Sequence, residues 1–254
     1  MTEQGPQTAL VTGAGKRIGR EIALDLGRAG WRVAVHYGSS AAGAEDAAAT
    51  IRDAGGTAAT FAADLADAAA VGLLVARVAR DMGPVTCLIN NASMFERDNP
   101  RTLTPETWDR HMAVNLRAPM LLAQGILAEL PVRMKGAVIN IIDQRVWNLT
   151  GDFTSYTISK FGLWGLTQTL ARALAPDIRV NAIGPGPTLP SVRQNDDDFA
   201  GQWQSTPLKR PVDPAEICHG VRFILDAPAM TGQMIALDSG QHLGLGFVDD
   251  AVAG

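Results

Sequence analysis

The chain has 254 residues, 46% of them hydrophobic, and a formal net charge of −4. Its length allows one or two domains with a substantial core, and no linker-like stretch interrupts it, so we expect a single domain over residues 1–254. The negative charge does not favour nucleic-acid binding, although it leaves room for a local basic pocket. Apolar runs are short and broken by Gly, Pro or charge, so we expect no transmembrane helix.

The N-terminal stretch MTEQGPQTALVTG has neither a basic flank nor an apolar signal segment, and we therefore expect a cytoplasmic protein. Cys87 and Cys218 belong to no Cys-x-x-Cys pair, and we interpret both as reduced core residues, with a disulfide as the alternative. The four histidines are scattered and show no spacing typical of zinc sites, so we expect no metal.

Apolar runs of strand length alternate with longer helical segments. The predicted strands, in chain order, are residues 8–12, 32–37, 57–64, 85–91, 136–142, 178–186 and 233–240. The predicted helices are residues 18–30, 41–55, 69–83, about 105–130, a helix that runs through 174 and a helix that begins at 214. This alternation predicts an α/β fold of the Rossmann-like, doubly wound type, with a mostly parallel sheet and helices on both faces. Ligands of such sheets bind at the carboxyl ends of the strands.

A glycine-rich turn, TGAGKRIG, follows the first predicted strand. Gly13, Gly15 and Gly19 let the backbone turn sharply and approach an anion, while the next helix offers free N–H groups and the positive end of its dipole. A dinucleotide pyrophosphate suits this place, because the turn lies between a strand and a helix. The alternatives are an ordinary tight turn and a mononucleotide P-loop; Arg17 after Lys16 disfavours the P-loop, which has Ser or Thr there.

The second predicted strand ends in VAVHYGSSA, with no acidic residue to bind the ribose hydroxyls of NAD. His36, Ser39 and Ser40 could donate hydrogen bonds to a 2′-phosphate. Lys16 and Arg17 could reach the same phosphate as cations. We therefore expect NADP(H) as the cofactor. The serines could also cap the helix that begins near residue 41, and the two roles are compatible.

Tyr156 and Lys160 are one helical turn apart and share a helix face. An isolated tyrosine is a poor acid at neutral pH, with a pKa of about 10, and a nearby ammonium group lowers that pKa. The lysine can also bind a ribose hydroxyl. Most Tyr-x-x-x-Lys pairs are surface neighbours without a catalytic role. This pair indicates catalysis because a predicted nucleotide-binding turn lies upstream and a predicted strand ends just before it.

Together these motifs resemble the short-chain dehydrogenase/reductase family over nearly the whole chain. The resemblance rests on TGAGKRIG, ADL at 63–65, NNAS at 90–93, VNLRAP, YTISK, NAIGPGPT at 181–188 and DSG near the end. It implies that Tyr156 donates a proton, that Lys160 is its electrostatic partner and that Asn115 helps to hold a relay water. The cofactor-binding residues that we predict are Gly13, Lys16, Arg17, Ile18, Gly19, His36, Ser39, Ser40, Asp64, Leu65, Asn91, Ala92, Ser93, Tyr156, Lys160, Pro185, Gly186 and Thr188.

The departure from the family pattern is Asp143, thirteen residues before the tyrosine, where members of the family usually have a serine. An ionised aspartate cannot donate a hydrogen bond, and close to Tyr156 it raises the pKa of the phenol. It is suited to accept hydrogen bonds from substrate N–H groups or to pass a proton to a nitrogen. We therefore expect a nitrogen heterocycle or imine rather than a simple ketone. The alternative role is that of a strand-end aspartate that caps a loop.

This combination resembles the pteridine reductase branch of the family. Arg17 matches its arginine in the glycine turn, Ser93 and Phe95 match its serine and stacking phenylalanine, and Asp143 matches its aspartate. The resemblance implies a pterin held between the nicotinamide and Phe95, with Arg17 and Ser93 at its polar edge and with Asp143 and Tyr156 serving protonation. The alternative for Phe95 is a plain core or loop aromatic residue.

We therefore expect an NADPH-dependent reductase that acts on a ring C=N bond of a pterin. The alternatives are a general NADP(H)-dependent carbonyl or alcohol oxidoreductase and a nucleotide-binding regulatory protein without turnover. We expect residues 189–210 to form a substrate-covering loop, in which Asp196 to Asp198 are solvated. The apolar surplus around Phe161 and Trp164 predicts a subunit contact, and the family resemblance implies a homotetramer.

Overall fold

A seven-stranded parallel sheet forms the centre of the computed structural model, which describes residues 7–190 and 195–244. The strand order is β3-β2-β1-β4-β5-β6-β7. The strands are β1 (Thr8–Val11), β2 (Arg32–Tyr37), β3 (Thr57–Ala62), β4 (Val85–Asn90), β5 (Gly136–Ile141), β6 (Ile178–Pro185) and β7 (Met234–Leu237). The doubly wound α/β fold expected from the alternating pattern is confirmed.

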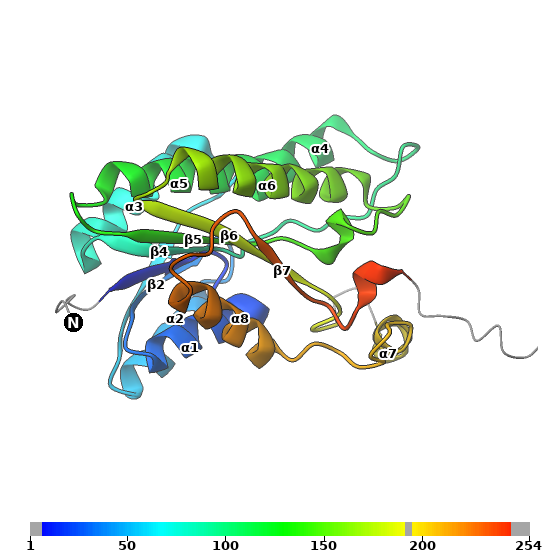
Figure 1. Ribbon diagram of the computed structural model, residues 1–254, viewed down its shortest axis with the longest axis horizontal. Coiled ribbons are helices and arrows are strands. Elements are labelled where there is room, and N and C mark those ends of the chain that lie inside the picture. Colours follow the sequence, from blue (N-terminus) through cyan, green and yellow to red (C-terminus); the bar gives the residue numbers. More distant parts are fainter. Residues whose placement is uncertain (1–6, 191–194, 245–254) are drawn as a thin grey trace, which may run out of the picture.

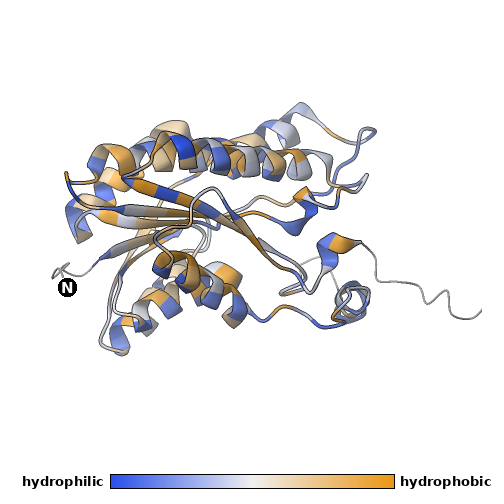
Figure 2. Cartoon of the chain, in the orientation of Figure 1, coloured by the Kyte–Doolittle hydropathy of each residue, from blue (hydrophilic) through white to orange (hydrophobic). Residues whose placement is uncertain are grey.

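Helices cover both faces of this sheet (Figure 1). One face carries α3 (Ala68–Met82), α4 (Pro105–Met112), α5 (Ala118–Glu129) and α6 (Thr154–Ala173). The other carries α1 (Arg17–Arg28), α2 (Ala41–Asp53) and α8 (Pro214–Asp226). Hydrophobic residues gather on the strands and on the helix sides that meet them, as Figure 2 shows, and the two faces hold separate core clusters. Cys87 and Cys218 are free and buried within the cluster on the α1 side.

The site-forming edge lies where the strand order reverses, between β1 and β4. The chain leaves β1 for α1 on one face, whereas the chain that leaves β4 reaches α4 and α5 on the other. The two strand ends stay joined, because the Thr12 amide donates to the Ile89 carbonyl at 3.0 Å. In doubly wound sheets, this divergence at the carboxyl ends of the strands is where ligands bind.

The helix predicted over about residues 105–130 is interrupted. A π-helical segment, Ala113–Arg117, separates α4 from α5. Pro119 lies in the first turn of α5 and has no N–H to donate to the Asn115 carbonyl four residues earlier, so the regular α-helical ladder cannot continue through this point. Periodicity alone did not reveal this local break, and it falls on a predicted catalytic residue.

The acidic run expected in a solvated loop instead begins a helix, α7 (Asp196–Gln204). The Asn195 side chain accepts a hydrogen bond from the Asp198 amide at 2.7 Å, and the Asp198 carboxylate accepts from the Asn195 amide, which forms a capping box. Carboxylates in a first helical turn also complement the helix dipole. Residues 191–194 of the predicted substrate-covering loop lie outside the described residues.

Within the described ranges, no helix is both long and apolar enough to cross a membrane. The same ranges contain no group of three His, Cys, Asp or Glu side chains that could hold a metal ion.

Candidate active site

The glycine turn after β1 is pressed against the end of β4. Gly13 has a φ of +64°, and a Cβ atom there would lie 2.9 Å from the Ala92 Cα. A Cβ atom on Gly19 would lie 2.3 Å from the Asn91 Nδ2 atom. That amide donates to the Thr12 carbonyl at 2.9 Å and so ties the two strand ends together. Only glycine fits these two positions, which leaves the backbone N–H groups of the turn close to any bound anion.

His36 supports this turn from the core. It is buried at the end of β2, where its Nδ1 atom accepts a hydrogen bond from the Gly13 amide at 3.2 Å and its Nε2 atom lies 3.1 Å from the Ala63 carbonyl. Burial lowers the pKa of His36 to about 4, so the ring is neutral and Nε2 carries its proton. Both nitrogens are therefore engaged, and the expected direct contact of His36 with a 2′-phosphate is wrong.

The first residues of α1 combine free backbone donors with positive charge. Lys16 is exposed at the N-cap position and makes no side-chain capping bond. Ile18 is half-buried. Arg17 has a left-handed backbone with a φ of 56°, and its guanidinium donates to the carbonyls of Leu189 (3.0 Å) and Pro190 (2.5 Å). Arg17 thus joins the glycine turn to the segment after β6, a contact that its sequence position did not reveal.

The end of β2 carries hydroxyl groups and no carboxylate. Ser39 is exposed, and Ser40 occupies the N-cap position of α2 without a side-chain capping bond. The alternative role as a helix-capping hydroxyl is therefore wrong for Ser40, whose hydroxyl stays available to a ligand. Glu45, the first acidic residue after the strand, lies within α2 and pairs with Arg52 at 2.5 Å.

The remaining predicted cofactor residues lie along the same edge of the sheet. Asp64 and Leu65 follow β3, where the Asp64 carboxylate accepts from the Ala66 amide at 2.9 Å and Leu65 is buried. Gly186 and Thr188 follow β6. A Cβ atom on Gly186 would lie 2.6 Å from the Asp238 Cα, so this segment also packs too tightly for a side chain.

The predicted proton-transfer pair lies between β5 and α6. Tyr156 is buried in the first turn of α6, and its hydroxyl donates to the Asp143 Oδ2 atom at 2.8 Å. The Asp143 Oδ1 atom accepts from the Arg145 amide at 2.8 Å and caps the short 3-10 helix η2 (Gln144–Val146). The capping role considered as the alternative for Asp143 is therefore present, and the same carboxylate also accepts the Tyr156 hydroxyl. Burial and, next, the Asp143 charge hold the pKa of Tyr156 well above its usual value of 10.

Lys160 lies one turn further along α6 with its ammonium group buried. Its Nζ atom donates to the Ile141 carbonyl at 2.8 Å and lies 5.8 Å from the centre of the Tyr156 ring. Burial lowers the pKa of Lys160 to about 8, against an opposing effect of Asp143. The expected lowering of the tyrosine pKa by this ammonium is wrong for this arrangement, because burial and the carboxylate both raise it. The Tyr156 hydroxyl is therefore protonated at neutral pH.

Asn115 anchors the loop after β4. Its Nδ2 group donates to the Met94 carbonyl at 3.0 Å and to the Ser159 hydroxyl at 2.9 Å, while its Oδ1 atom accepts from the Met94 amide at 2.8 Å. The Ser93 hydroxyl also donates to this Oδ1 atom at 3.3 Å. The side chain thus fixes Ser93 and the following Phe95 relative to α6.

Phe95 is stacked, but on a protein residue. Its ring lies parallel to that of Phe153, with centroids 4.6 Å apart, and edge-on to Tyr156 at 4.7 Å. Phe95 is 40% exposed, so one face is covered by Phe153 while part of the ring stays open to a ligand. Phe153 is the N-cap residue of α6 and has a φ of 62°. Phe153 is not among the predicted site residues, and its place three residues before the tyrosine is the only signal for it in the sequence.

A buried polar cluster under the first turn of α6 was also missed. The Ser155 amide donates to the Asp98 Oδ1 atom at 3.1 Å, and the Ser155 hydroxyl donates to the Asp98 Oδ2 atom. The same hydroxyl lies 2.8 Å from the Nδ1 atom of His111. The Phe153 amide donates to the Asp98 carbonyl at 2.7 Å. Because all three polar residues are buried, the cluster is an anchor that positions Tyr156, not a nucleophilic centre.

Comparisons with known proteins agree with this geometry. A family model described as short chain dehydrogenase matches residues 7–200. The 3-oxoacyl-[acyl-carrier-protein] reductase FabG of Staphylococcus epidermidis is 31% identical over 244 residues, which covers 93% of this chain and 99% of that protein.

Solved structures agree as well. FolM alternative dihydrofolate reductase 1 from Brucella canis, complexed with NADP, is 47% identical, has a TM-score of 0.92 and matches over 96% of this chain and 97% of its own. The angucycline C-6 ketoreductase LanV, with bound NADP, is 34% identical, has a TM-score of 0.87 and matches over 94% and 96% of the two chains.

Proposed function

The chain belongs to the short-chain dehydrogenase family, and we propose that it is an NADPH-dependent reductase of a ring C=N bond in a pterin. The hydrogen bond of 2.8 Å from the Tyr156 hydroxyl to the Asp143 carboxylate carries this proposal. The family fold supplies a nucleotide site and a proton donor to many chemistries. The carboxylate beside the donor is the feature that selects among them.

The residues present fit NADP(H). The turn at Gly13 and Gly19 has no room for side chains and presents backbone donors to a pyrophosphate. Lys16 and the Ser40 hydroxyl offer a cation and a donor to a 2′-phosphate, and no carboxylate at the end of β2 repels it. Two structural neighbours, FolM and LanV, were crystallised with NADP. An affinity for NADPH that does not exceed that for NADH would contradict this assignment.

The charge of Asp143 favours nitrogen over oxygen as the atom that receives the proton. Hydride addition to a ketone builds negative charge on oxygen, which a neighbouring carboxylate opposes. Reduction of a C=N bond proceeds more readily when the nitrogen is protonated and positive, and a neighbouring carboxylate stabilises that charge. An ionised aspartate also accepts the N–H groups at the polar edge of a heterocycle.

NADPH, when bound, supplies the hydride to the ring carbon. The protein's own groups handle the proton: Tyr156 holds it on its hydroxyl, within hydrogen-bond reach of Asp143, and delivers it to the ring nitrogen. Because the pKa of Tyr156 is raised, the phenol keeps its proton at neutral pH and has one to donate. Asp143 then accepts hydrogen bonds from the N–H groups of the heterocycle. The buried ammonium group of Lys160 stays beside the tyrosine because it donates a hydrogen bond to the Ile141 carbonyl.

The comparisons support two enzyme functions to different degrees. The FolM structures from Brucella canis and Brucella suis, titled alternative dihydrofolate reductases, are 47% and 46% identical to this chain. FabG and LanV, a 3-oxoacyl-[acyl-carrier-protein] reductase and a C-6 ketoreductase by name, are 31% and 34% identical. Carbonyl reduction is therefore the second candidate, and Asp143 is the observation against it.

The deciding experiment measures NADPH oxidation with dihydrobiopterin, with dihydrofolate and with a panel of ketones. We expect turnover of the pterins and little with the ketones. Activity on ketones alone would refute the pterin assignment. Tight NADPH binding without turnover on any substrate would instead favour a regulatory nucleotide-binding protein.

We also propose that the protein is a cytoplasmic homotetramer. Ile158 and Phe161 on the outer side of α6 are 48% and 50% exposed, a large apolar exposure for a monomer surface. Light scattering of the purified protein tests the assembly, and Phe161→Glu should dissociate it if this face is a subunit contact. A monomeric wild-type protein would refute the tetramer.

A further inference from the structure

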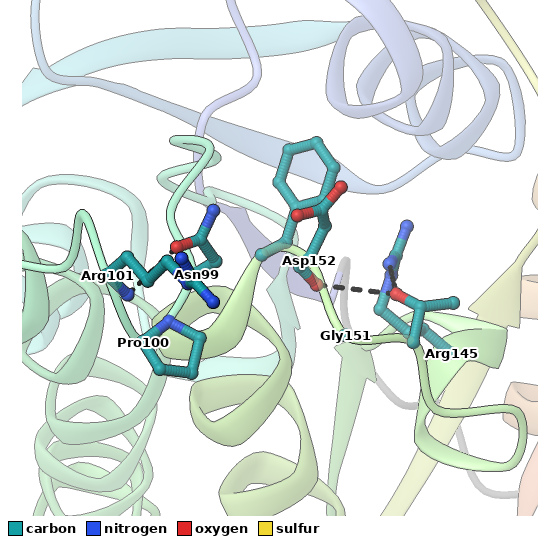
Figure 3. Close-up of a pocket in the computed structure, with 8 residues that line it drawn as sticks. Asn99, Pro100, Arg101, Arg145, Gly151 and Asp152 are labelled. Carbon is teal, nitrogen blue, oxygen red and sulfur yellow. Dashed lines mark hydrogen bonds between the residues drawn. The ribbon is translucent and has the colours of Figure 1, made fainter.

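A pocket of about 720 Å³ opens next to the proton-transfer pair. Two segments line it: residues 99–101, which follow β4, and Arg145 with residues 150–153 from the connection between β5 and α6. Figure 3 shows Asn99, Pro100 and Arg101 on one side of the pocket and Arg145 on the other, with Asp152 between them. Both segments follow strands whose carboxyl ends carry the catalytic site, so pocket and site share one edge of the sheet.

The pocket has an excess of positive charge. Arg101 and Arg145 line it, and Asp152 is the one carboxylate among its described lining residues. Asp152 already pairs with a third arginine, Arg97, at 2.8 Å. In the described part of the chain, Arg101 and Arg145 form no ion pair with a carboxylate. An uncompensated pair of guanidinium groups in a chain with a net charge of −4 is a recognition feature for carboxylates.

Arg145 connects this charge to the catalytic centre. Its backbone amide donates to Asp143, whereas its side chain donates to the Thr150 hydroxyl on the pocket wall. The guanidinium carbon lies 5.2 Å from the centre of the Phe153 ring, and the Nε group is buried without a hydrogen-bond partner. An unpartnered buried donor is costly in a finished structure, so the protein itself leaves this guanidinium incompletely satisfied.

Aromatic rings connect the pocket to Tyr156. Phe153 lines the pocket and stacks on Phe95, and Phe95 contacts Tyr156 edge-on. A flat ring held at Phe95 and Tyr156 therefore has Phe153 and then Arg145 beside it. A substituent that extends from such a ring over Phe153 would place its far end among the arginines.

We propose that this basic pocket is a subsite for a carboxylate-bearing tail of the substrate. The inference rests on the proposed reduction of a pterin and names its class: a pterin that carries an acidic tail, as dihydrofolate does, rather than one with a short neutral side chain, such as dihydrobiopterin. Arg101 and Arg145 would bind the carboxylates, and Phe153 would pack against the connecting ring.

The test compares steady-state kinetics on both substrates for the wild type, Arg101→Gln, Asp152→Asn and the matched control Arg172→Gln, which removes an exposed charge at the far end of α6. We expect the wild type to have the lower KM for dihydrofolate, and Arg101→Gln to raise that KM about 5-fold while leaving the KM for dihydrobiopterin unchanged. Asp152→Asn should lower the KM for dihydrofolate, because it frees Arg97. Arg172→Gln should change neither.

A direct binding measurement separates this inference from the proposed function. Calorimetric titration with p-aminobenzoylglutamate, the isolated tail of a folate, should show binding that Arg101→Gln weakens and added salt reduces. If the protein reduces both pterins but Arg101→Gln and Asp152→Asn leave the KM values and the titration unchanged, the subsite is refuted and the reductase stands. If no pterin is reduced but the tail binds through Arg101, the reductase is refuted and the anion site stands.

Discussion

The cofactor side and the proton-transfer side of the site are built by different means. At the β1–α1 turn, backbone atoms approach so closely that added Cβ atoms would clash at Gly13 and Gly19. Around Tyr156, by contrast, the geometry comes from side-chain hydrogen bonds between segments far apart in the chain, such as those that join Asp98 to Ser155.

This difference predicts two kinds of failure. A change in the glycine turn has to move backbone, so it should cost folding stability and cofactor affinity together. A change at Tyr156 or Asp143 removes one polar group from a half-open site, so it should cost turnover and leave the fold intact. The four substitutions below test this division, from the largest expected effect to the smallest.

Tyr156→Phe should reduce kcat for the pterin substrate by about 1,000-fold, because it removes the proton donor. NADPH affinity and the free energy of unfolding should stay close to those of the wild type. Stopped-flow turnover, NADPH fluorescence titration and urea unfolding check the three quantities. Wild-type turnover in this variant would remove Tyr156 from its role.

His36→Gln tests how the buried, neutral ring of His36, which supports the glycine turn from the core, contributes to the free energy of unfolding. The pKa of His36 falls from an ordinary value of 6.5 to about 4 on folding, so the unfolded chain takes up this proton first. The contribution of the neutral ring is fully present above pH 6.5 and is lost as the pH falls towards 4. At pH 4 the loss is about 3 kcal/mol.

Glutamine has no titrating ring, so the difference in unfolding free energy between pH 7 and pH 4 should be smaller in His36→Gln by that amount. Urea unfolding at both pH values measures it. His219→Gln, which changes an exposed histidine of α8, is the control and should follow the wild type. Identical pH profiles for all three proteins would contradict the burial of a neutral His36.

Asp143→Ser should lower kcat/KM for dihydrobiopterin by about 30-fold and permit slow ketone reduction, because a hydroxyl donor replaces the carboxylate. Without that charge the pKa of Tyr156 should fall. The pH profile of kcat/KM therefore reports the change separately from any loss of the η2 cap, which serine can partly replace. Undiminished pterin turnover would reduce Asp143 to its capping role.

Gly19→Ala should destabilise the protein by about 2 kcal/mol and weaken NADPH binding, because the new methyl group meets Asn91 and the Gly13 carbonyl. Gly72→Ala is the matched control: Gly72 is also helical, in α3, and has open space around its Cβ position. That change should stabilise the protein by about 0.5 to 1 kcal/mol. Equal unfolding free energies for the two variants would show that the turn tolerates a side chain.

Two predictions differ from the structure because each was based on a short sequence motif alone. The place of His36 at the end of β2 predicts a ligand contact, yet the residue after β3 and the glycine turn engage both its nitrogens. The charge of residues 196–198 predicts a solvated loop, yet the Asn195 capping box and the helix dipole favour a first helical turn there. In both cases the structure depends on a hydrogen-bond partner that lies outside the sequence motif from which the prediction was made.

The sequence by itself determined the fold class and the glycine turn, and it predicted the proton-transfer pair. These features depend on local properties: apolar periodicity, the conformational freedom of glycine and the spacing of Asp143, Tyr156 and Lys160. Only the tertiary structure decided the rest. The Asp98–Ser155–His111 anchor joins residues 44 and 57 positions apart, and the basic pocket joins the segments at 101 and 145. No local pattern encodes such contacts, because burial and charge balance arise only when the strands bring the segments together.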